Sequence, residues 1–233
     1  MARKKLNVKD VLPRLSSILD LLDDNQRDML TKHTIVQAYK KNEQIYAEGD
    51  APAYLLCLVS GKVKIYKEGV GGRMQIVRVI RPVQYFGYRA AFASQNYVTA
   101  AAAFEPSVIV KIPIGTVIHL MQESTRLSWF FIERLSIDLG RADERTVNLT
   151  QKHIRGRLAE SLLFLKDSYG LEEDGSTLSI YLSREDLANL SNMTTSNAIR
   201  TLSNFATERL IAIDGRKIKI IDEMKLEKIS RIG

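Results

Sequence analysis

The hydrophobic periodicity of this chain changes twice, and these changes limit its fold more than any other feature of the sequence. Over residues 6–33, apolar residues recur at spacings of three and four, which predicts an amphipathic helix. Over residues 35–113, short apolar or alternating runs end at turn residues, which is typical of an all-β sandwich or barrel. Helical periodicity returns over residues 114–150. The sequence therefore predicts an α+β fold with an N-terminal β-roll or jelly roll and a long helix behind it.

The remaining sequence continues with a helix, a short strand at residues 178–182, two helices around a tight turn, and a hairpin. We therefore expect three parts. Residues 1–115 form an N-terminal helix and the β-roll, residues 116–150 form the long helix and a hinge, and residues 151–233 form a second compact domain.

The long helix carries one apolar stripe. Its members recur at helical spacing and are Leu127, Phe131, Leu135, Ala142 and Leu149. A helix of this length with an apolar seam commonly packs against a second copy of itself, so we expect a homodimer. The alternative is that the stripe packs into the core of its own chain. Asp138 and Arg145 lie on or beside the stripe, where polar residues can fix the register of pairing.

The composition excludes several classes of protein. Hydrophobic residues make up 45% and charged residues 26% of the chain, as in ordinary globular proteins. No apolar run reaches the roughly 18 residues that a membrane span needs. The basic start at residues 1–5 is followed by amphipathic sequence and not by an apolar signal core. We therefore expect a cytoplasmic protein without a membrane partner.

Cys57 is the only cysteine of the sequence, so disulfides within the chain and cysteine-ligated iron–sulfur clusters are excluded. It stands in an apolar run and is expected to be a buried hydrophobe. The three histidines are His33, His119 and His153, and no two are spaced as a metal pair. Metal oxygenases built on a barrel need two histidines and a carboxylate on strands. Because residues 35–113 contain no histidine, we expect neither a metal site nor an enzyme.

The formal net charge of +7 is of a kind that often accompanies nucleic-acid binding. Its distribution weakens that inference. Residues 1–150 contain 21 basic and 15 acidic residues, whereas residues 151–233 contain 13 and 12. An interpretation of the second domain as a DNA-binding domain therefore has to rest on the placement of individual residues.

The most specific pattern lies at residues 182–202. Ser183 stands where a helix N-cap is expected, and Asp186 follows at the capping-box position. After this first helix comes a tight turn, in which Asn192 is expected to adopt the left-handed conformation that asparagine tolerates well. Thr194 then caps a second helix. The pattern predicts a helix-turn-helix.

The second helix is expected to present a polar face. On that face Thr195 and Ser196 stand at the start of the helix and Arg200 stands one turn later. Hydroxyl groups there suit phosphate and base-edge contacts, and an outward arginine can bind O6 and N7 of guanine. The inward residues are expected to be Ala198, Ile199 and Leu202. The alternative is that these two helices belong to an ordinary α+β core.

A hairpin follows the second helix. Asp214 and Gly215 form its two-residue turn between strands rich in β-branched residues. Arg216 and Lys217 stand at the tip, where they can contact a phosphate of DNA. We interpret this hairpin as the wing of a winged helix-turn-helix that binds double-stranded DNA.

From about residue 15 to its end, the chain resembles the Crp–Fnr family of bacterial transcription regulators. The resemblance rests on Gly49-Asp50, the run Tyr54–Tyr66, Phe86-Gly87, residues 182–200 and the Asp-Gly turn of the wing. It implies a homodimer that binds an approximately palindromic operator, with RNA polymerase as a further partner, and leaves activation or repression open. It also implies that an unidentified small-molecule or gas effector binds in the β-roll and shifts the long helices.

The resemblance also assigns roles to residues of the second domain. Arg200 matches the arginine that typically reads a G·C pair, and Thr195 and Ser196 match the other two base-facing positions. Family members often carry glutamate at the Ser196 position, so the operator should differ from the best-known consensus. Contacts to the DNA backbone are expected from Ser183, Arg184, Thr194, Asn197, Arg216 and Lys217.

The effector residues depart from the family pattern. Members that bind cyclic AMP have glutamate where Tyr88 stands, and arginine followed by serine or threonine where this chain has Val98 and Thr99. Without that arginine the charge-assisted contact to the cyclic phosphate is lost, so cyclic AMP is not expected. Arg89 is adjacent to Tyr88, but neighbouring residues of a strand point to opposite faces.

No cofactor is assigned from the sequence. Some relatives bind haem, which needs only one or two axial ligands, so haem stays open with His119 as the candidate. A surface histidine is the simpler interpretation. A third hypothesis is a module that senses a ligand and signals only through protein contacts, against which the wing and Arg200 argue.

Overall fold

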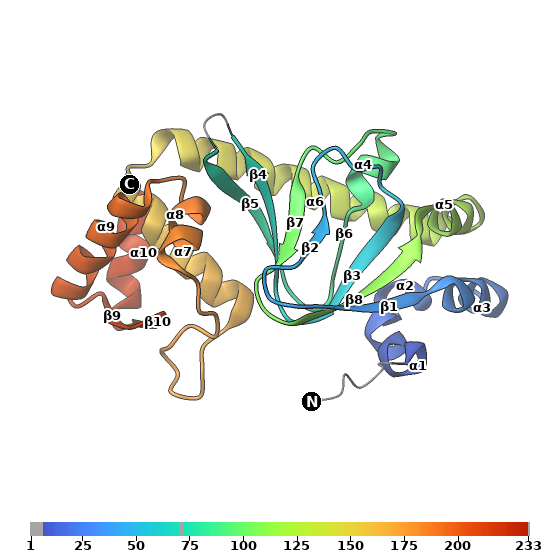
Figure 1. The fold of residues 1–233 in the computed structure, drawn as a ribbon, viewed down its shortest axis with the longest axis horizontal. Coiled ribbons are helices and arrows are strands. Elements are labelled where there is room, and N and C mark those ends of the chain that lie inside the picture. The colour runs from blue at the N-terminus through green and yellow to red at the C-terminus, as the bar shows by residue number, and fades with distance from the viewer. Residues whose placement is uncertain (1–6, 70–71, 233) are drawn as a thin grey trace. The chain divides into compact units, whose positions relative to one another are not determined.

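A computed structural model describes residues 7–69 and 72–232 (Figure 1). The chain forms two compact units. Unit 1 consists of residues 1–67 and 77–139, and unit 2 of residues 68–76 and 140–233. Among the described residues, no helix has both the length and the apolar character that crossing a membrane requires.

The start of unit 1 contains several short helices where the periodicity predicted one. They are α1 (Val8–Val11), the 3-10 helix η1 (Leu12–Leu15), α2 (Ser16–Leu19) and α3 (Asp24–His33). Asp23 is the N-cap of α3, and its carboxylate accepts a hydrogen bond from the Gln26 amide at 2.9 Å. This capping box starts a new helix, so the helix is interrupted before Asp24. The apolar residues keep their helical spacing across the interruption, which is why the sequence predicted a single helix.

Two four-stranded sheets form the β-roll, which confirms the predicted fold class (Figure 1). The first has the order β1-β8-β3-β6, with β1 (Ile35–Tyr39), β8 (Ser107–Pro113), β3 (Tyr54–Ser60) and β6 (Gln84–Phe86). The second has the order β2-β7-β4-β5, with β2 (Gln44–Tyr46), β7 (Ala100–Ala103), β4 (Val63–Glu68) and β5 (Met74–Ile80).

Strand β3 shows how the first sheet is covered on both sides. Leu56 and Leu58 pack in the core with residues of both sheets, whereas Leu55 and Cys57 pack against the helices. This follows from the two-residue period of a strand, which sends alternate side chains to opposite faces. All four residues are buried, so Cys57 is the buried hydrophobe that the sequence predicted.

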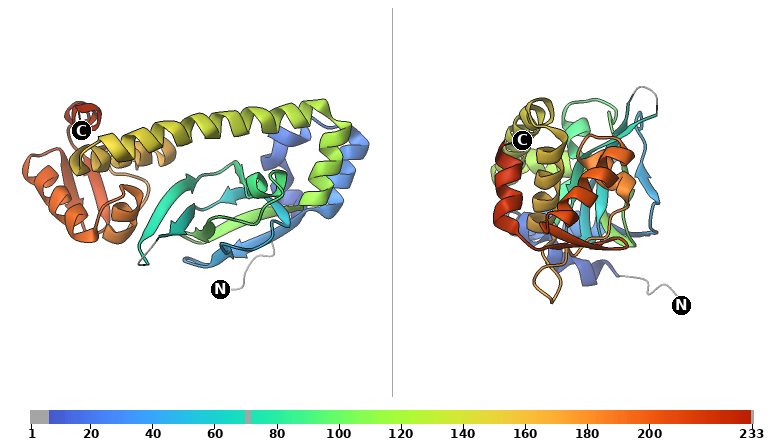
Figure 2. Two further views of the ribbon diagram at one scale, coloured as in Figure 1. Left: turned by 90° about the horizontal axis from the view of Figure 1, so that it is seen from above. Right: turned by 90° about the vertical axis from the view of Figure 1, so that its left-hand side faces the viewer.

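Two helices follow the β-roll, α5 (Ile114–Glu123) and α6 (Thr125–Gln151), and α6 is continuous over its length (Figure 2). Leu127 and Phe131 of α6 are each 1% exposed and lie in the core of unit 1. Their side chains are therefore not available to a second copy, and the intramolecular alternative holds for these two. Of the other stripe residues, Leu135 packs at the edge of that core, Ala142 is exposed and Leu149 is half-buried.

A short helix stands where Tyr88 and Arg89 were assumed to lie on a strand. Gly87 adopts φ 83° directly after β6, and α4 (Tyr88–Phe92) begins there. The strand assumption was wrong, because this left-handed glycine turns the chain out of the sheet. The two side chains nevertheless separate: Tyr88 is buried and Arg89 is exposed.

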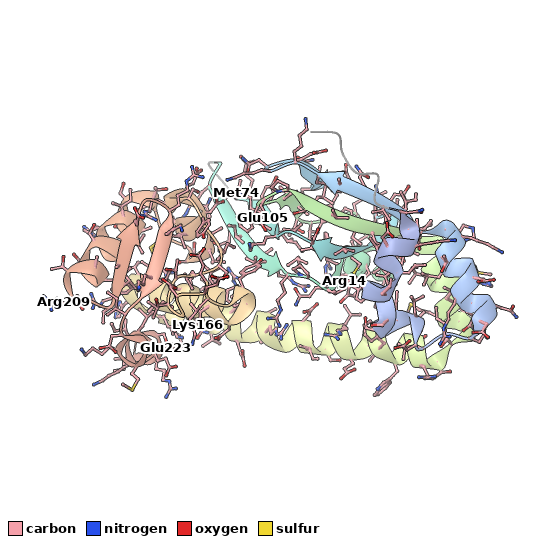
Figure 3. All side chains as sticks on the ribbon, turned by 90° about the horizontal axis from the view of Figure 1, so that it is seen from below. Arg14, Met74, Glu105, Lys166, Arg209 and Glu223 are labelled. Carbon is pink, nitrogen blue, oxygen red and sulfur yellow. The ribbon has the colours of Figure 1, made fainter. Side chains whose placement is uncertain are left out.

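Unit 2 contains the predicted helices and hairpin together with one helix that the sequence analysis missed. Its elements are α7 (Ile154–Tyr169), α8 (Arg184–Leu190), α9 (Thr195–Thr207), β9 (Ile211–Asp214), β10 (Lys217–Ile220) and α10 (Glu223–Ile232). The missed helix is α10, which packs against α7 through the buried Leu226. Lys166 of α7 and Glu223 of α10 form an ion pair at this contact (Figure 3).

The strand expected at residues 178–182 does not form. Only two isolated bridges occur nearby, Leu171 with Leu178 and Thr177 with Lys219. Leu178, Ile180 and Leu182 are buried as an alternating pattern requires. The alternation therefore correctly indicated an extended chain with one buried side, but it could not indicate whether a partner strand lies beside it.

Candidate functional site

The first helix of the predicted helix-turn-helix begins as its capping pattern indicates. The Ser183 hydroxyl accepts a hydrogen bond from the Asp186 amide at 3.0 Å and donates one to the Asp186 carboxylate at 2.8 Å. Leu187 and Ala188 are buried on the inner face of α8. The capping bonds fix the entry of the chain into α8, which supplies one side of the turn.

The turn between α8 and α9 has the predicted conformation. Asn192 adopts φ 50°, which confirms the left-handed position, and the Met193 amide donates to the Ala188 carbonyl at 3.0 Å. Ser191 is buried, and its hydroxyl donates to that of Ser161 in α7 at 2.8 Å. This bond explains why a polar residue is tolerated at a position where apolar residues are common in such motifs.

Helix α9 presents an exposed polar face at its start. The Thr194 hydroxyl caps the helix by accepting from the Asn197 amide at 3.2 Å. Thr195, Ser196 and Arg200 are all exposed. The guanidinium of Arg200 donates through Nη2 to Oδ1 of Asn197 at 2.9 Å. The structure thus brings together the three residues expected to read bases.

Ile199 is a correction to the sequence analysis, which placed it on the inner face. Its side chain is 49% exposed, whereas Ala198 and Leu202 are buried as expected. At 3.6 residues per turn, position 199 lies over positions 195 and 196, so it belongs to the outer face. An apolar side chain therefore stands beside Arg200 on the face that carries the base-reading candidates.

The wing forms, but its turn lies one residue later than predicted: the two turn residues are Gly215 and Arg216, and Asp214 is the last residue of β9. Asp214 pairs with Lys217 across the turn, and Gly215 has φ 55°. Arg184 of α8 donates through Nη2 to the Gly215 carbonyl at 2.7 Å, so it ties the first helix to the turn of the wing. Arg216 is exposed at the tip and forms no ion pair with any residue that the structure describes.

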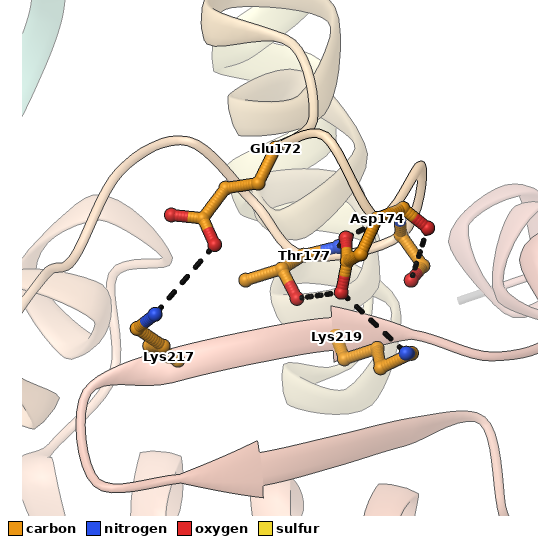
Figure 4. A network of polar contacts seen from close by, with 6 residues as sticks. Glu172, Asp174, Thr177, Lys217 and Lys219 are labelled. Carbon is orange, nitrogen blue, oxygen red and sulfur yellow. Dashed lines mark hydrogen bonds and ion pairs between the residues drawn. The ribbon is translucent and has the colours of Figure 1, made fainter.

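An acidic loop before the helix-turn-helix faces the second strand of the wing (Figure 4). Lys217 pairs with Glu172 at 3.6 Å, and Lys219 pairs with Asp174 at 3.5 Å. The Asp174 carboxylate also accepts hydrogen bonds from the Thr177 hydroxyl and amide at 2.7 and 2.8 Å. These bonds hold the pKa of Asp174 well below its ordinary range. The sequence analysis missed these pairs, although the spacing of lysines on β10 was visible.

Two of the effector candidates, Thr99 and Arg89, act on a buried tyrosine of β2. Tyr46 stacks on Tyr97 with ring centroids 3.8 Å apart, and Thr99 lowers the pKa of the Tyr46 hydroxyl. Burial raises the pKa of Tyr46 to about 12, and the opposing effects of Arg78 and Arg89 place both guanidiniums within electrostatic reach of its hydroxyl. Thr99 and Arg89 therefore both act on the Tyr46 hydroxyl.

The other two effector candidates differ in their surroundings. Tyr88 is buried, and its pKa rises to about 12, first because of burial and then because of the nearby Asp138 carboxylate. Val98 is exposed, and its carbonyl accepts a hydrogen bond from Lys67 at 3.0 Å. No arginine stands at the Val98 position, so the charged contact used for a cyclic phosphate is absent from it.

Two other features of unit 1, a surface hollow and His119, do not provide a second candidate binding site for a charged ligand. An open hollow of about 410 Å³ lies between α4, α5 and α6, and among the residues that line it none is charged. His119 is a half-exposed residue of α5 beside Glu123, 3.4 Å away. In the part of the chain that the structure describes, no three histidine, cysteine or acidic residues gather as a metal site.

Comparison with known proteins agrees with both halves of the structure. Residues 36–124 match the cyclic nucleotide-binding domain, and residues 156–229 match the Crp-like helix-turn-helix domain. The chain therefore belongs to the Crp–Fnr family of DNA-binding transcription regulators. This is a family of regulators and not of enzymes.

Relatives of known role are distant from this chain in sequence. It is 24% identical to the CRP-like cAMP-activated global transcriptional regulator of Mycobacterium tuberculosis, over 87% of this chain and 91% of that one. It is also 24% identical to the global nitrogen regulator of a Nostoc species, over 83% and 88%. Among solved structures, FixK2 from Bradyrhizobium japonicum has the same fold, with a TM-score of 0.77, 21% identity, and coverage of 84% and 96%.

Proposed function

We propose that this regulator binds an approximately palindromic operator as a homodimer, with Thr195, Ser196 and Arg200 of each copy contacting base edges in the major groove. The observation that carries the proposal is that α9 exposes all three on one face, with Arg200 held by Asn197. Helix-turn-helix dimers place their two recognition helices in half-sites about 34 Å apart, which is one turn of DNA.

The expected contacts to the DNA backbone come from two groups of residues. The capping hydroxyls of Ser183 and Thr194, with the Asn197 amide group, lie at helix N-termini, where phosphates bind well. The cations are Arg184, Arg216 and Lys217. Arg184 and Lys217 already have partners within the chain, at Gly215 and Glu172, so we expect Arg216 to provide the strongest cationic contact.

For the dimer we propose a seam on the exposed side of α6. Ile132 is 50% and Leu139 is 64% exposed. Together with residues of the predicted stripe they give helical spacings of three, four and seven, which suits pairing with a second copy. The proposed seam consists of Ile132, Leu135, Leu139, Ala142 and Leu149. Leu127 and Phe131 are left out because they are buried in their own chain.

For control, we propose that an effector other than cyclic AMP acts through the β-roll. The effector domain is assigned to residues 1–115, the dimer helix and hinge to residues 116–150, and the DNA-binding domain to residues 151–233. The absence of a cation at Val98 and the burial of Tyr88 beside a carboxylate support a different ligand. The regulator is proposed to act in the cytoplasm together with RNA polymerase.

Selection of random duplex DNA by the purified protein tests this function. At physiological salt and without effector, we expect enrichment of a two-fold symmetric site. The same selection with Arg200→Ala should lose its preference at one base pair in each half-site. If the protein enriches no sequence, either alone or with any of the candidate effectors added, the proposed operator binding is contradicted.

A further inference from the structure

Three polar side chains from separate elements of unit 1 meet beside the effector candidates. Arg78 of β5 donates through Nη1 to Oδ2 of Asp138 in α6 at 2.8 Å. The hydroxyl of the buried Tyr88 in α4 lies near the same carboxylate, which raises the pKa of that hydroxyl. The side chains of Arg78 and Asp138 are 39% and 21% exposed, so the pair is neither fully buried nor free in solvent.

A second guanidinium lies in the same region. Arg89 is exposed and, like Arg78, lies within electrostatic reach of the Tyr46 hydroxyl. Arg78 has a carboxylate partner, whereas Arg89 forms no ion pair with any residue that the structure describes. Arg134 also acts on Tyr88, so the guanidiniums near this site outnumber the one carboxylate, Asp138, that acts on Tyr88.

We propose that Arg78 and Tyr88 form a binding site for a carboxylate. In the absence of a ligand the side chain of Asp138 occupies this site, and a small carboxylate effector displaces it. The proposal rests on the proposed function, in which the effector acts through the β-roll, and names the chemical class of that effector. Arg89, on the exposed side, supplies the contact for a second anionic group of the ligand. Binding releases Asp138, which belongs to the helix that carries the proposed dimer seam.

The group that now binds Arg78 is the carboxylate of Asp138, which indicates that the ligand is also a carboxylate. A guanidinium N–H already donates to a carboxylate here, beside the buried Tyr88 phenol, and bonds of this kind between charged groups are the strong ones. The ligand that we propose is small, because the pair it would open is only partly exposed, with 39% of the Arg78 side chain and 21% of the Asp138 side chain accessible.

Competition between ligand and Asp138 makes the proposal quantitative. A ligand that binds only when Asp138 has left Arg78 has an apparent affinity reduced by the fraction of molecules in that state. Removal of the Asp138 charge should therefore tighten carboxylate binding, by about fivefold for a partly exposed ion pair. Removal of the Arg78 charge should abolish it, whether or not Asp138 is present.

The experiment is a calorimetric titration of the full chain without DNA, in Tris–chloride at constant ionic strength. The probes are acetate and succinate, with inorganic phosphate as the contrasting anion. The variants are Asp138→Asn, Arg78→Gln and the double variant. Asp143→Asn is the matched control, because it removes the same charge from an exposed position of α6. We expect Asp138→Asn to bind succinate about fivefold more tightly than wild type and the control, and both Arg78 variants to bind neither carboxylate.

Equal succinate affinity of Asp138→Asn and Asp143→Asn would overturn the proposal, and tighter binding of phosphate than of succinate would overturn the ligand class. If Asp138→Asn does not fold, the comparison of wild type with Arg78→Gln decides alone, since binding that survives Arg78→Gln contradicts the site. Because DNA is absent from this experiment, failure of the operator selection with intact succinate binding would refute the proposed function and leave this site standing.

Discussion

The guanidinium of Arg200 is held by the side-chain oxygen of Asn197, which lies three residues earlier on the same exposed face of α9, at 2.9 Å. An arginine restrained in this way loses less side-chain entropy when it binds a base. Asn197 therefore has two tasks, because its backbone amide also donates to the capping hydroxyl of Thr194. The side-chain and backbone groups of one residue connect the start of the helix to the arginine that is proposed to read a base.

Arg200→Ala should weaken binding to the selected operator by about 1–3 kcal/mol and relax preference at one base pair per half-site. Asn197→Ala should keep that preference and weaken binding less, by about two- to fivefold, since it removes only the restraint. Fluorescence anisotropy with operator variants measures both effects. Arg231→Ala, an exposed arginine of α10, is the control. Unchanged preference in Arg200→Ala would contradict its assignment.

Ile132→Glu and Leu139→Glu should convert the dimer to monomer, because each places a charge in the proposed apolar seam of α6. Sedimentation velocity over a range of protein concentrations measures the change. Met224→Glu introduces the same charge at an exposed apolar residue of α10 and should leave the dimer intact. A dimer that persists in both seam variants would show that the copies pair elsewhere.

Cys57 should be inert to thiol reagents in the folded protein. Burial raises the pKa of its thiol to about 12, so at pH 8 only about one molecule in 10,000 carries the reactive thiolate. A chromogenic disulfide reagent should react fully only in denaturant. The sign of the pH effect follows: because the folded-state pKa is the higher one, the contribution of this thiol to stability is full below about pH 8.5 and falls as the pH rises toward 12. Fast modification of the native protein would contradict the burial.

Ser191→Ala should lower the free energy of unfolding by about 1–2 kcal/mol, because it leaves the buried hydroxyl of Ser161 without its partner. The double variant Ser161→Ala, Ser191→Ala should be closer to wild type than the sum of the single changes, since neither hydroxyl then remains unpaired. Urea unfolding of the four proteins completes this cycle. Additive losses would show that the two hydroxyls do not interact.

Much of this fold could be predicted from the sequence because its signals are local. The capping pattern at Ser183 and the left-handed Asn192 each depend on a few neighbouring residues, and each forms as predicted. The wing hairpin was also found, with its turn one residue later than predicted. The two-residue period likewise indicated the β-roll. For the same reason the three proposed base-reading residues were found together on one exposed face.

What the sequence could not provide depends on contacts between distant residues. Periodicity shows that a helix has an apolar stripe but not which surface covers it, so Leu127 and Phe131 were assigned to a partner although their own chain buries them. The pair Arg78–Asp138 joins residues 60 positions apart, and no local pattern marks it. Ile199 was misplaced for a different reason: its apolar character was given more weight than its angular position on the helix.

The pairing of the wing lysines with an acidic loop affects how the protein responds to salt. A cation that is already neutralised by Glu172 or Asp174 displaces few counterions from DNA, and counterion release is what makes such binding salt-dependent. The wing therefore contributes less nonspecific affinity than its lysines suggest. A protein built in this way spends less time on unrelated DNA, and its occupancy of the operator should tolerate changes in intracellular ionic strength better than that of a relative with unpaired wing lysines.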